Sequence, residues 1–395
     1  MCKQDRTSSG GAQSWGVDMP IVALDIFCGC GGVTYGLAKA GIRVAVGVDV
    51  DEDCRLTYVL NNPRTRFVSA DVRKVSGNAL LEYPGGFRQG DYLLLAACAP
   101  CQPFSLQNRF RREAADRTVL CHVERLVREL LPDFLLMENV PGIQRVAGFS
   151  AFRRLLQALR NLRYTTRFQI VDAVSYGIPQ SRRRLVLLAS LHGVVPWPEP
   201  THGDRAGLQR PVTVRDVIGK YPALRAGEAH PTIANHVAAK LAPRNLVRII
   251  ATPPDGGGRR DWPTALRVTC HEHHDGHPDV YGRLRWDMPA PTLTTRCTSL
   301  SNGRYGHPEQ HRAISAREAA ALQSFDDSYV FYGTLGAVAA QIGNAVPPVL
   351  AERFGAAFVA TVGNLTGPKN KPMRRFLNAK PNLHRRATGQ RKQVN

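Results

Sequence analysis

The feature that most constrains the fold is an alternation, from Ile21 to about Ala189, of short apolar runs with segments of helical periodicity. Valines and leucines from Val119 to Leu131 recur at three- and four-residue steps, which gives a helix one apolar face, and the pattern returns from Phe149 to Leu162. Strand and helix repeated in this way predict an α/β fold with a mostly parallel, doubly wound, Rossmann-like sheet covered on both faces. The predicted strands are 21–27, 43–49, 92–97, 133–137, 167–172 and 184–189.

The pattern changes after Pro196. Prolines and glycines become frequent, and regular periodicity is weak up to about residue 330, which predicts a second, smaller, loop-rich domain. Helical periodicity returns from Leu335 to Val362. We therefore expect a first domain over 20–195, a second over 196–330, helices over 331–365 that return to the first domain, and flexible tails over 1–19 and 367–395.

The chain is strongly basic, since 52 lysines and arginines against 32 acidic residues give a net charge of +20 over 395 residues. Nine of the basic residues lie in 367–395, which has no acid, so the remainder still carries +11 and both parts could contact nucleic acid. The nine scattered cysteines indicate free thiols in a reducing compartment. No apolar stretch reaches the roughly 20 residues of a membrane span and no signal peptide is recognised, so we expect a cytoplasmic protein.

A glycine-rich loop, 25–32, directly follows the first predicted strand and precedes a helical segment. Such glycines let the backbone approach a ligand and turn tightly into the helix. The dinucleotide fingerprint G-x-G-x-x-G fails because Thr34 replaces its last glycine. Asp49, 24 residues after Asp25, stands where an acid meets ribose hydroxyls in such folds. The loop therefore predicts a nucleoside pocket, and the alternative is a structural turn with a capping aspartate.

Two further strand ends carry reactive side chains. Cys101 follows the third predicted strand, where a depressed pKa and a nucleophilic thiolate are plausible. The alternatives are a redox role for the C-x-x-C pair with Cys98 and a structural cysteine. Glu138 ends the next apolar run, where a buried carboxylate needs a partner, a proton or a ligand. The 37 residues between Cys101 and Glu138 fit one strand–helix–strand crossover, so both should lie at the same edge of the sheet, although a satisfied structural glutamate remains an alternative.

Gln180, Arg182 and Arg184 alternate before the last predicted strand, so their side chains can share one face. Two guanidiniums there suit a phosphate or a carbonyl oxygen, unless this is a solvated basic edge. The histidine-rich segment 270–277 fails the zinc motif H-E-x-x-H because Asp275 replaces the second histidine. We therefore predict no metal site and expect these side chains to contact bases or phosphates.

Jointly, these residues resemble the DNA (cytosine-5) methyltransferases, specifically the bacterial type II modification methylases. The departures are Ile26, where the family often has leucine, and Ala345, where serine is common. The matching segments occur in the order of the family's motifs and are 25–32, 100–102, 138–140, 180–184, 291–296 and 343–348.

The resemblance implies transfer of a methyl group from S-adenosylmethionine to C5 of a cytosine flipped out of a specific double-stranded DNA sequence. The Cys101 thiolate would add to C6, Glu138 would hold N3, and Arg184 would contact the base carbonyl oxygen. Arg182 would organise the site or bind a nearby phosphate. The residues expected to bind the cofactor are Asp25, Phe27, Gly29, Gly31, Asp49, Val50, Asp71, Val72, Pro100, Asn344 and Ala345.

The same resemblance makes 196–330 the target-recognition domain and 20–195 the catalytic domain. It implies a monomer on DNA in the bacterial cytoplasm, associated with the nucleoid and functionally paired with a restriction endonuclease. The alternatives are an RNA (tRNA) cytosine-5 methyltransferase and a catalytically silent DNA-binding protein. The residues expected at DNA are Gln102, Ser105, Gln180, Arg259, Arg260, Arg283, Arg285 and Arg296.

Overall fold

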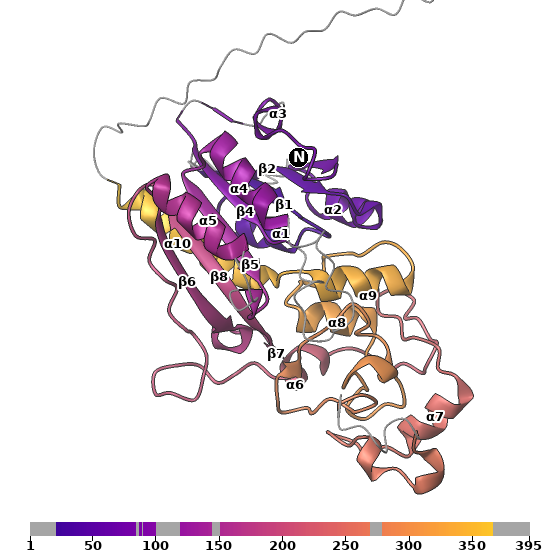
Figure 1. Ribbon diagram of the computed structural model, residues 1–395. Coiled ribbons are helices and arrows are strands. Elements are labelled where there is room, and N and C mark those ends of the chain that lie inside the picture. The colour runs from indigo at the N-terminus through magenta and orange to yellow at the C-terminus, as the bar shows by residue number, and fades with distance from the viewer. Residues whose placement is uncertain are drawn as a thin grey trace, which may run out of the picture. The chain divides into compact units, whose positions relative to one another are not determined.

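The computed structural model describes residues 21–83, 87, 88, 90–99, 119–143, 151–268 and 279–365. Within them a central sheet of seven strands has the order β3-β2-β1-β4-β5-β8-β6 (Figure 1). The predicted α/β fold class is thereby confirmed, and each of the six predicted strands is present, within one or two residues at either end. The sheet strands are β1 (Ile21–Ile26), β2 (Arg43–Asp49), β3 (Arg66–Ser69), β4 (Tyr92–Ala97), β5 (Phe134–Asn139), β6 (Thr165–Asp172) and β8 (Arg183–Ser190).

One strand runs against the others. β1 pairs in parallel with β2 and β4, and β5 pairs in parallel with β4, as the strand–helix pattern predicts. β8 is antiparallel to both β5 and β6. The connection from β6 to β8, residues 173–182, is shorter than the dozen or so residues that a parallel crossover needs. As a result the first residues of β8 lie beside the last residues of β5.

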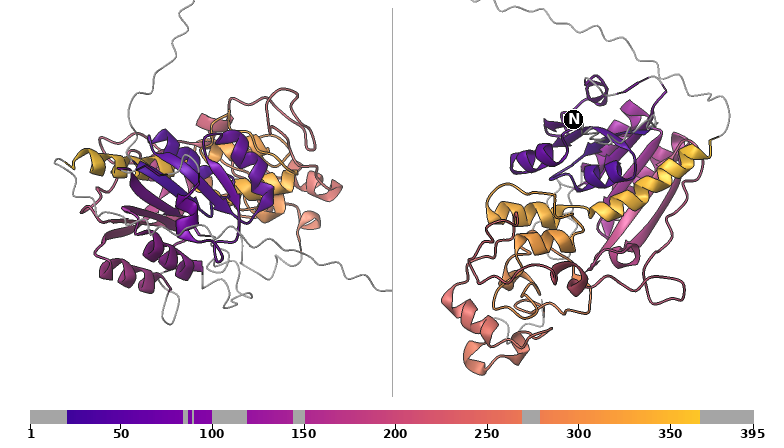
Figure 2. Two further views of the ribbon diagram at one scale, coloured as in Figure 1. Left: turned by 90° about the horizontal axis from the view of Figure 1, so that it is seen from above. Right: turned by 180° about the vertical axis from the view of Figure 1, so that it is seen from behind.

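Helices cover both faces of the sheet (Figures 1 and 2). On one face lie α4 (Val119–Leu130) and α5 (Ala151–Asn161), whose buried leucines and valines join one apolar cluster with the strands of the sheet. On the other, α1 (Gly32–Lys39) packs against α10 (Pro348–Gly363). Gly36 permits this close approach, because a Cβ atom there would lie 2.2 Å from the carbonyl oxygen of Pro348.

The remaining helices are short, and several of them share a second apolar cluster. This cluster joins α6, α8 and α9 to buried residues of the glycine-rich loop 25–32, such as Cys30, and of the segment 284–305. α8 lies within the region where sequence periodicity is weak, so it was not predicted. The domain boundaries at 196 and 330 stay a prediction. The helices are α2 (Arg55–Asn61), α3 (Gly77–Leu81), α6 (Val214–Ile218), α7 (Pro243–Ile250), α8 (Ala316–Leu322) and α9 (Leu335–Asn344).

The segment Leu335–Gly363 has the length and apolarity of a membrane span by composition alone. The structure divides it into α9 and α10, with Pro347 and Pro348 at the break, and 67% of its most apolar window is buried inside the protein. Its apolar side chains are therefore used in packing, for example where the Phe358 ring lies 5.1 Å from that of Phe134 in β5.

Candidate functional site: the carboxyl edge of the sheet

The end of β5 and the start of β8 bring a carboxylate and a guanidinium together. Glu138, the fifth residue of β5, is 6% exposed, and its Oε1 lies 2.9 Å from Nε of Arg184 in an ion pair. The antiparallel register explains the contact: Glu138 is opposite Val186, and Arg184 lies two residues earlier on the same face of β8. The structure thus places two of the expected catalytic side chains at one point of the sheet edge.

The neighbouring strand β4 ends at the same edge. The side-chain amide of Asn139 donates a hydrogen bond to the carbonyl oxygen of Ala99, 3.2 Å away. This contact fixes the last described backbone group before the segment 100–118. The expected residues Pro100, Cys101, Gln102 and Ser105 lie in that segment, outside the described residues.

Arg182 and Gln180 are buried among protein groups. Arg182 is 3% exposed, and its guanidinium donates to the carbonyl oxygens of Leu293 and Ala345, at 3.3 and 3.1 Å. This arrangement fits the organising role that the resemblance implies. Gln180 is 0% exposed and its amide is engaged by Leu322, Gln323 and Leu293, so the burial speaks against the DNA contact expected for Gln180.

The glycine-rich loop has a backbone that few other residues could adopt. Phe27 has φ 65°, Gly29 φ 51° and Gly31 φ 97°. The Gly29 amide donates to Oδ2 of Asp49 at 2.7 Å, which ties the loop to the end of β2. At Gly31 a Cβ atom would lie 2.7 Å from the Tyr329 hydroxyl, so both the conformation and the space require glycine.

Asp25 is a carboxylate with no exposed surface at the end of β1. Its Oδ2 accepts a hydrogen bond of 2.7 Å from the Thr34 hydroxyl, while its Oδ1 is buried and has no hydrogen-bond partner. Burial, with the charge of Asp49 adding to it, raises the pKa of Asp25 to about 7. Thr34, which excludes the dinucleotide fingerprint, thus has a positive role as the donor to this carboxylate.

The other expected cofactor residues that the structure describes differ in exposure. Val50 is 70% exposed after β2, and Asn344 is exposed at the last position of α9. The first loop and the α9 end approach closely, since a Cβ atom at Gly32 would lie 2.4 Å from the carbonyl oxygen of Val346. Val72 and Ala345 are buried. The Asp71 carboxylate accepts hydrogen bonds from Arg73, which lower its pKa to about 2.

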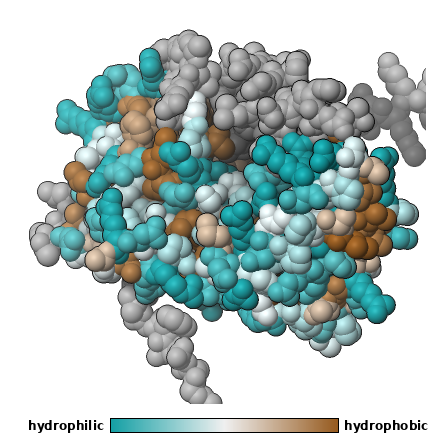
Figure 3. All heavy atoms as spheres, turned by 90° about the horizontal axis from the view of Figure 1, so that it is seen from below, coloured by the Kyte–Doolittle hydropathy of each residue, from teal (hydrophilic) through white to brown (hydrophobic). Residues whose placement is uncertain are grey.

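The arginines expected at DNA differ in exposure. Arg260, Arg285 and Arg296 are exposed, and Arg259 is partly exposed. The side of the molecule where α7 lies is mostly hydrophilic, with separate hydrophobic areas (Figure 3). Four arginines of this set can therefore meet a polyanion.

Arg283 cannot meet DNA in this conformation, which corrects the expectation for this residue. It is 0% exposed, and its guanidinium donates to backbone carbonyl oxygens of Ile249, Thr252, His307 and Gln310, at 2.6 to 3.0 Å. These four bonds tie α7 to the loop before α8. Its burial also lowers the pKa of the guanidinium to about 10. The role of Arg283 is structural.

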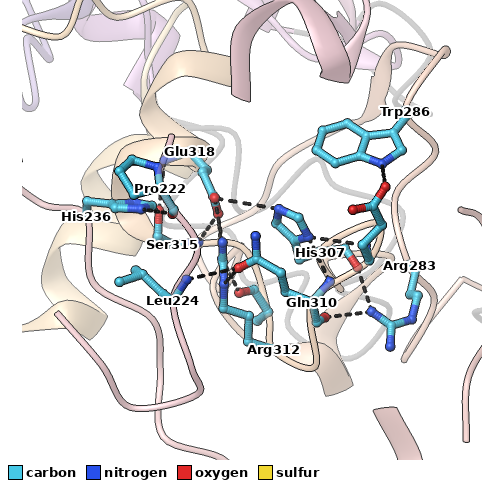
Figure 4. Close-up of polar contacts among 12 residues, drawn as sticks. Pro222, Leu224, His236, Arg283, Trp286, His307, Gln310, Arg312, Ser315 and Glu318 are labelled. Atoms are coloured by element: carbon cyan, nitrogen blue, oxygen red, sulfur yellow. Dashed lines mark hydrogen bonds and ion pairs between the residues drawn. The ribbon is translucent and has the colours of Figure 1, made fainter. Parts of the chain in front are cut away.

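A second buried network, beside Arg283, was missed by sequence reasoning (Figure 4). Arg312 and Glu318 form two bonds of 2.7 Å and are 0% and 1% exposed. Glu318 also accepts from the Ser315 amide, which completes a capping box at the start of α8. His307 lies 3.9 Å from Glu318, and burial lowers its pKa to about 4. The Ser315-x-x-Glu318 spacing was the sequence signal that could have found this helix start.

The comparison with known proteins decides the family. The family model described as C-5 cytosine-specific DNA methylase matches residues 21–360. The chain belongs to this family. The methylase fold of this chain is similar to the crystal structure of a putative DNA modification methyltransferase encoded within an Escherichia coli prophage. That similarity has a TM-score of 0.69 at 22% identity and covers 87% of this chain and 99% of the other.

Two curated methylases show the kind of enzyme. The chain is 42% identical to the type II methylase M.HgiDII of Herpetosiphon aurantiacus, over 83% of this chain and 92% of the relative. It is 31% identical to the type II methyltransferase M1.HphI of Haemophilus parahaemolyticus, over 86% and 87%. The protein is thus a C-5 cytosine DNA methyltransferase of the type II modification kind, and the predicted family and enzyme class are confirmed. The histidine-rich segment 270–277 lies outside the described residues.

Proposed function

We propose that the protein transfers a methyl group from S-adenosylmethionine to C5 of a cytosine flipped out of duplex DNA, through a transient bond between Cys101 Sγ and C6. The observation that carries the proposal is the buried Glu138–Arg184 pair at the edge of the sheet, next to the strand end that leads into Cys101. An acid and a guanidinium side by side can hold the N3 and the carbonyl oxygen of one pyrimidine.

The covalent step answers a chemical difficulty. C5 of cytosine is a poor nucleophile, and addition of the Cys101 thiolate at C6 gives C5 the electron density to bond to the methyl carbon. The bond between that carbon and the sulfonium sulfur of S-adenosylmethionine would break, and the demethylated thioether would leave. The C5 proton is then lost, the bond between sulfur and C6 breaks, and the ring regains aromaticity. Glu138 stabilises the protonated N3 during addition, and Arg184 holds the carbonyl oxygen beside it. Arg182 holds the backbone at Leu293 and Ala345 in place through hydrogen bonds to their carbonyl oxygens.

The residues around the first loop fit S-adenosylmethionine, which would supply the electrophilic methyl group. Buried Oδ1 of Asp25 lacks a partner, and the exposed Val50 side chain offers an apolar surface beside Asp49. The glycines at 29 and 31 allow close approach of a ligand to the backbone. Phe27, Asp71, Val72, Pro100, Asn344 and Ala345 complete the proposed set.

On the DNA side, the cytosine must leave the stack, which costs a few kcal/mol that backbone contacts offset. We assign these contacts to the exposed arginines and to Gln102 and Ser105 of the Cys101 segment, and exclude Arg283 and Gln180 because they are buried. The assigned arginines are Arg259, Arg260, Arg285 and Arg296.

The type II relatives favour a biological setting in which a cognate restriction endonuclease cuts unmodified DNA. We propose that the methyltransferase acts as a monomer on DNA in the bacterial cytoplasm. The recognised sequence is the property that distinguishes such an enzyme from its relatives, and bisulfite sequencing of DNA from cells expressing it would read that sequence directly.

The test uses purified protein and tritiated S-adenosylmethionine. Wild type should label duplex DNA and not tRNA, and should form an adduct, stable to denaturation, with a duplex containing 5-fluorocytosine. Cys101→Ser should lose both activities while still binding the cofactor, whereas Cys121→Ser, a partly buried thiol on α4, should keep both. Turnover by Cys101→Ser would refute the covalent route, and labelling of tRNA instead of DNA would establish the RNA alternative.

A further inference from the structure

Three buried polar side chains connect segments that are far apart in the sequence. We call these three residues the buried polar cluster. They are Gln180, Arg182 and Gln323, which are 0%, 3% and 0% exposed. Gln180 belongs to β7 (Gln180–Ser181), which pairs with β9 (Ala290–Pro291), and Gln323 directly follows α8. The family resemblance accounts for Gln180 and Arg182 but gives no role to Gln323.

The cluster supplies hydrogen-bond donors to carbonyl groups at the carboxyl end of α9. The last carbonyl groups of a helix have no partner within it and need one elsewhere when they are buried. The Gln323 amide donates to the carbonyl oxygens of Ile342 and Ala345, at 2.9 and 2.6 Å. Arg182 donates to the carbonyl oxygen of Ala345 as well, at 3.1 Å. The turn at 344–345 is therefore held by two side chains from outside α9.

The orientation of the Gln323 amide is fixed by its other contact. Its Oε1 accepts a hydrogen bond from the Gln180 side chain, so its nitrogen must face the two carbonyl oxygens. Gln180 in turn accepts from the Leu293 amide at 3.0 Å. A continuous chain of hydrogen bonds thus runs from the backbone at Leu293 through two amides to the end of α9.

The turn that this chain holds is part of the proposed cofactor site. Asn344 lies between the two carbonyl groups that Gln323 binds, and its own side chain is exposed. The next residues meet the glycine-rich loop, where Val346 leaves no room for a side chain at Gly32. A displacement of the 344–345 turn would therefore move both Asn344 and the loop.

We propose that Gln323 is a positioning residue that sets the 344–345 turn and thereby the affinity for S-adenosylmethionine. This inference rests on the proposed cofactor. Gln323 does not touch the cytosine or the cofactor itself; it acts through Asn344 and the glycine-rich loop. Loss of the amide leaves two buried carbonyl groups with fewer partners, and the turn is expected to move to satisfy them.

The decisive variant is Gln323→Leu, with Asn61→Leu as a matched control. Asn61 also donates from its amide to two carbonyl oxygens, those of Thr57 and Val330, at 2.7 Å each, and it accepts from the Val330 amide. Both variants lose the same kinds of bond, but only Gln323 lies at the 344–345 turn. Gln323→Met, with a flexible chain of similar length, is the second variant if the leucine form does not fold.

The measurements are cofactor binding by calorimetry, DNA binding without cofactor, and thermal unfolding. Gln323→Leu should raise the Kd for S-adenosylmethionine by about tenfold or more, the change expected from about 1.4 kcal/mol, and should leave the Kd for DNA within about twofold. An equal rise in Asn61→Leu, or a lower melting temperature without a change in cofactor Kd, would overturn the inference. Failure of the wild type to bind S-adenosylmethionine would instead refute the proposed function.

Discussion

The buried Arg312–Glu318 pair gives the sharpest stability prediction. Two parallel bonds of 2.7 Å join the guanidinium to the carboxylate, and Arg312 also donates to the carbonyl oxygen of Ala313 and to the Gln310 side chain (Figure 4). Arg312→Met removes the positive charge and leaves the Glu318 carboxylate buried, with its hydrogen bond from the Ser315 amide but without its ionic partner. Breaking one side of a buried pair costs about 3–5 kcal/mol.

The matched control is an exposed pair of the same geometry. Arg210 donates two bonds to Asp216, at 2.7 and 2.8 Å, and its side chain is 71% exposed. Arg210→Met should cost less than about 1 kcal/mol, because water solvates the carboxylate that remains. The free energy of unfolding of both variants, measured by urea denaturation at pH 7.5, gives the comparison.

The acid side of the pair adds a pH test. Burial acts to raise the pKa of Glu318, but the hydrogen bonds and charge of Arg312 outweigh it and lower that pKa. A lowered carboxyl pKa contributes stability above the unfolded value, near 4.3, and this contribution is lost as the pH falls below it. In Arg312→Met burial is no longer outweighed, so Glu318 should become protonated at a higher pH than in wild type, and the gap in stability between the two proteins should narrow as the pH falls from 7.5 through the ordinary carboxyl range. Equal costs for Arg312→Met and Arg210→Met, or a gap independent of pH, would refute the reasoning.

Three other perturbations test separate parts of the structure. Asp25→Asn removes the carboxyl whose pKa burial raises from 3.8 to about 7, a shift equivalent to about 4 kcal/mol. The stability of wild type relative to the variant should therefore fall as the pH rises from 4 to 7. Urea midpoints of the two proteins that run parallel across that range would contradict this. Arg283→Met should lower the free energy of unfolding by about 3 kcal/mol or more, because four carbonyl groups lose a donor, while the salt dependence of DNA binding stays unchanged. Arg260→Ala should leave the free energy of unfolding unchanged. It should reduce the slope of log K for DNA binding against log salt concentration by about one, as measured by fluorescence anisotropy.

The sequence predicted the sheet well because apolar runs report burial. β1, β4 and β5 are buried at every position, and each begins with a run of at least four apolar residues. β3 was missed because it has four residues at the edge of the sheet and begins with an exposed arginine. The direction of β8 was also missed, although the short connection from β6 contained that information.

Some features of the candidate site could likewise be predicted from the sequence, and others could not. Spacing predicted that Glu138 would lie at the carboxyl edge, because one crossover sets the distance along the chain. The arginines could not be sorted from sequence, since Arg283 and Arg285 have the same local composition but only Arg283 is buried. Burial of an arginine depends on carbonyl groups supplied by distant segments, here at 249, 252, 307 and 310, and no local pattern records them.

The Glu138–Arg184 pair depends on the register of the antiparallel strands β5 and β8. Because side chains alternate between the two faces, a slip of β8 by one residue against β5 would turn Arg184 away from Glu138 and present Arg183, now exposed, in its place. Insertion of one residue between β7 and β8 is a direct way to impose such a slip. The guanidinium that faces the acid is thus specified by the length of a connection as much as by the identity of the residue.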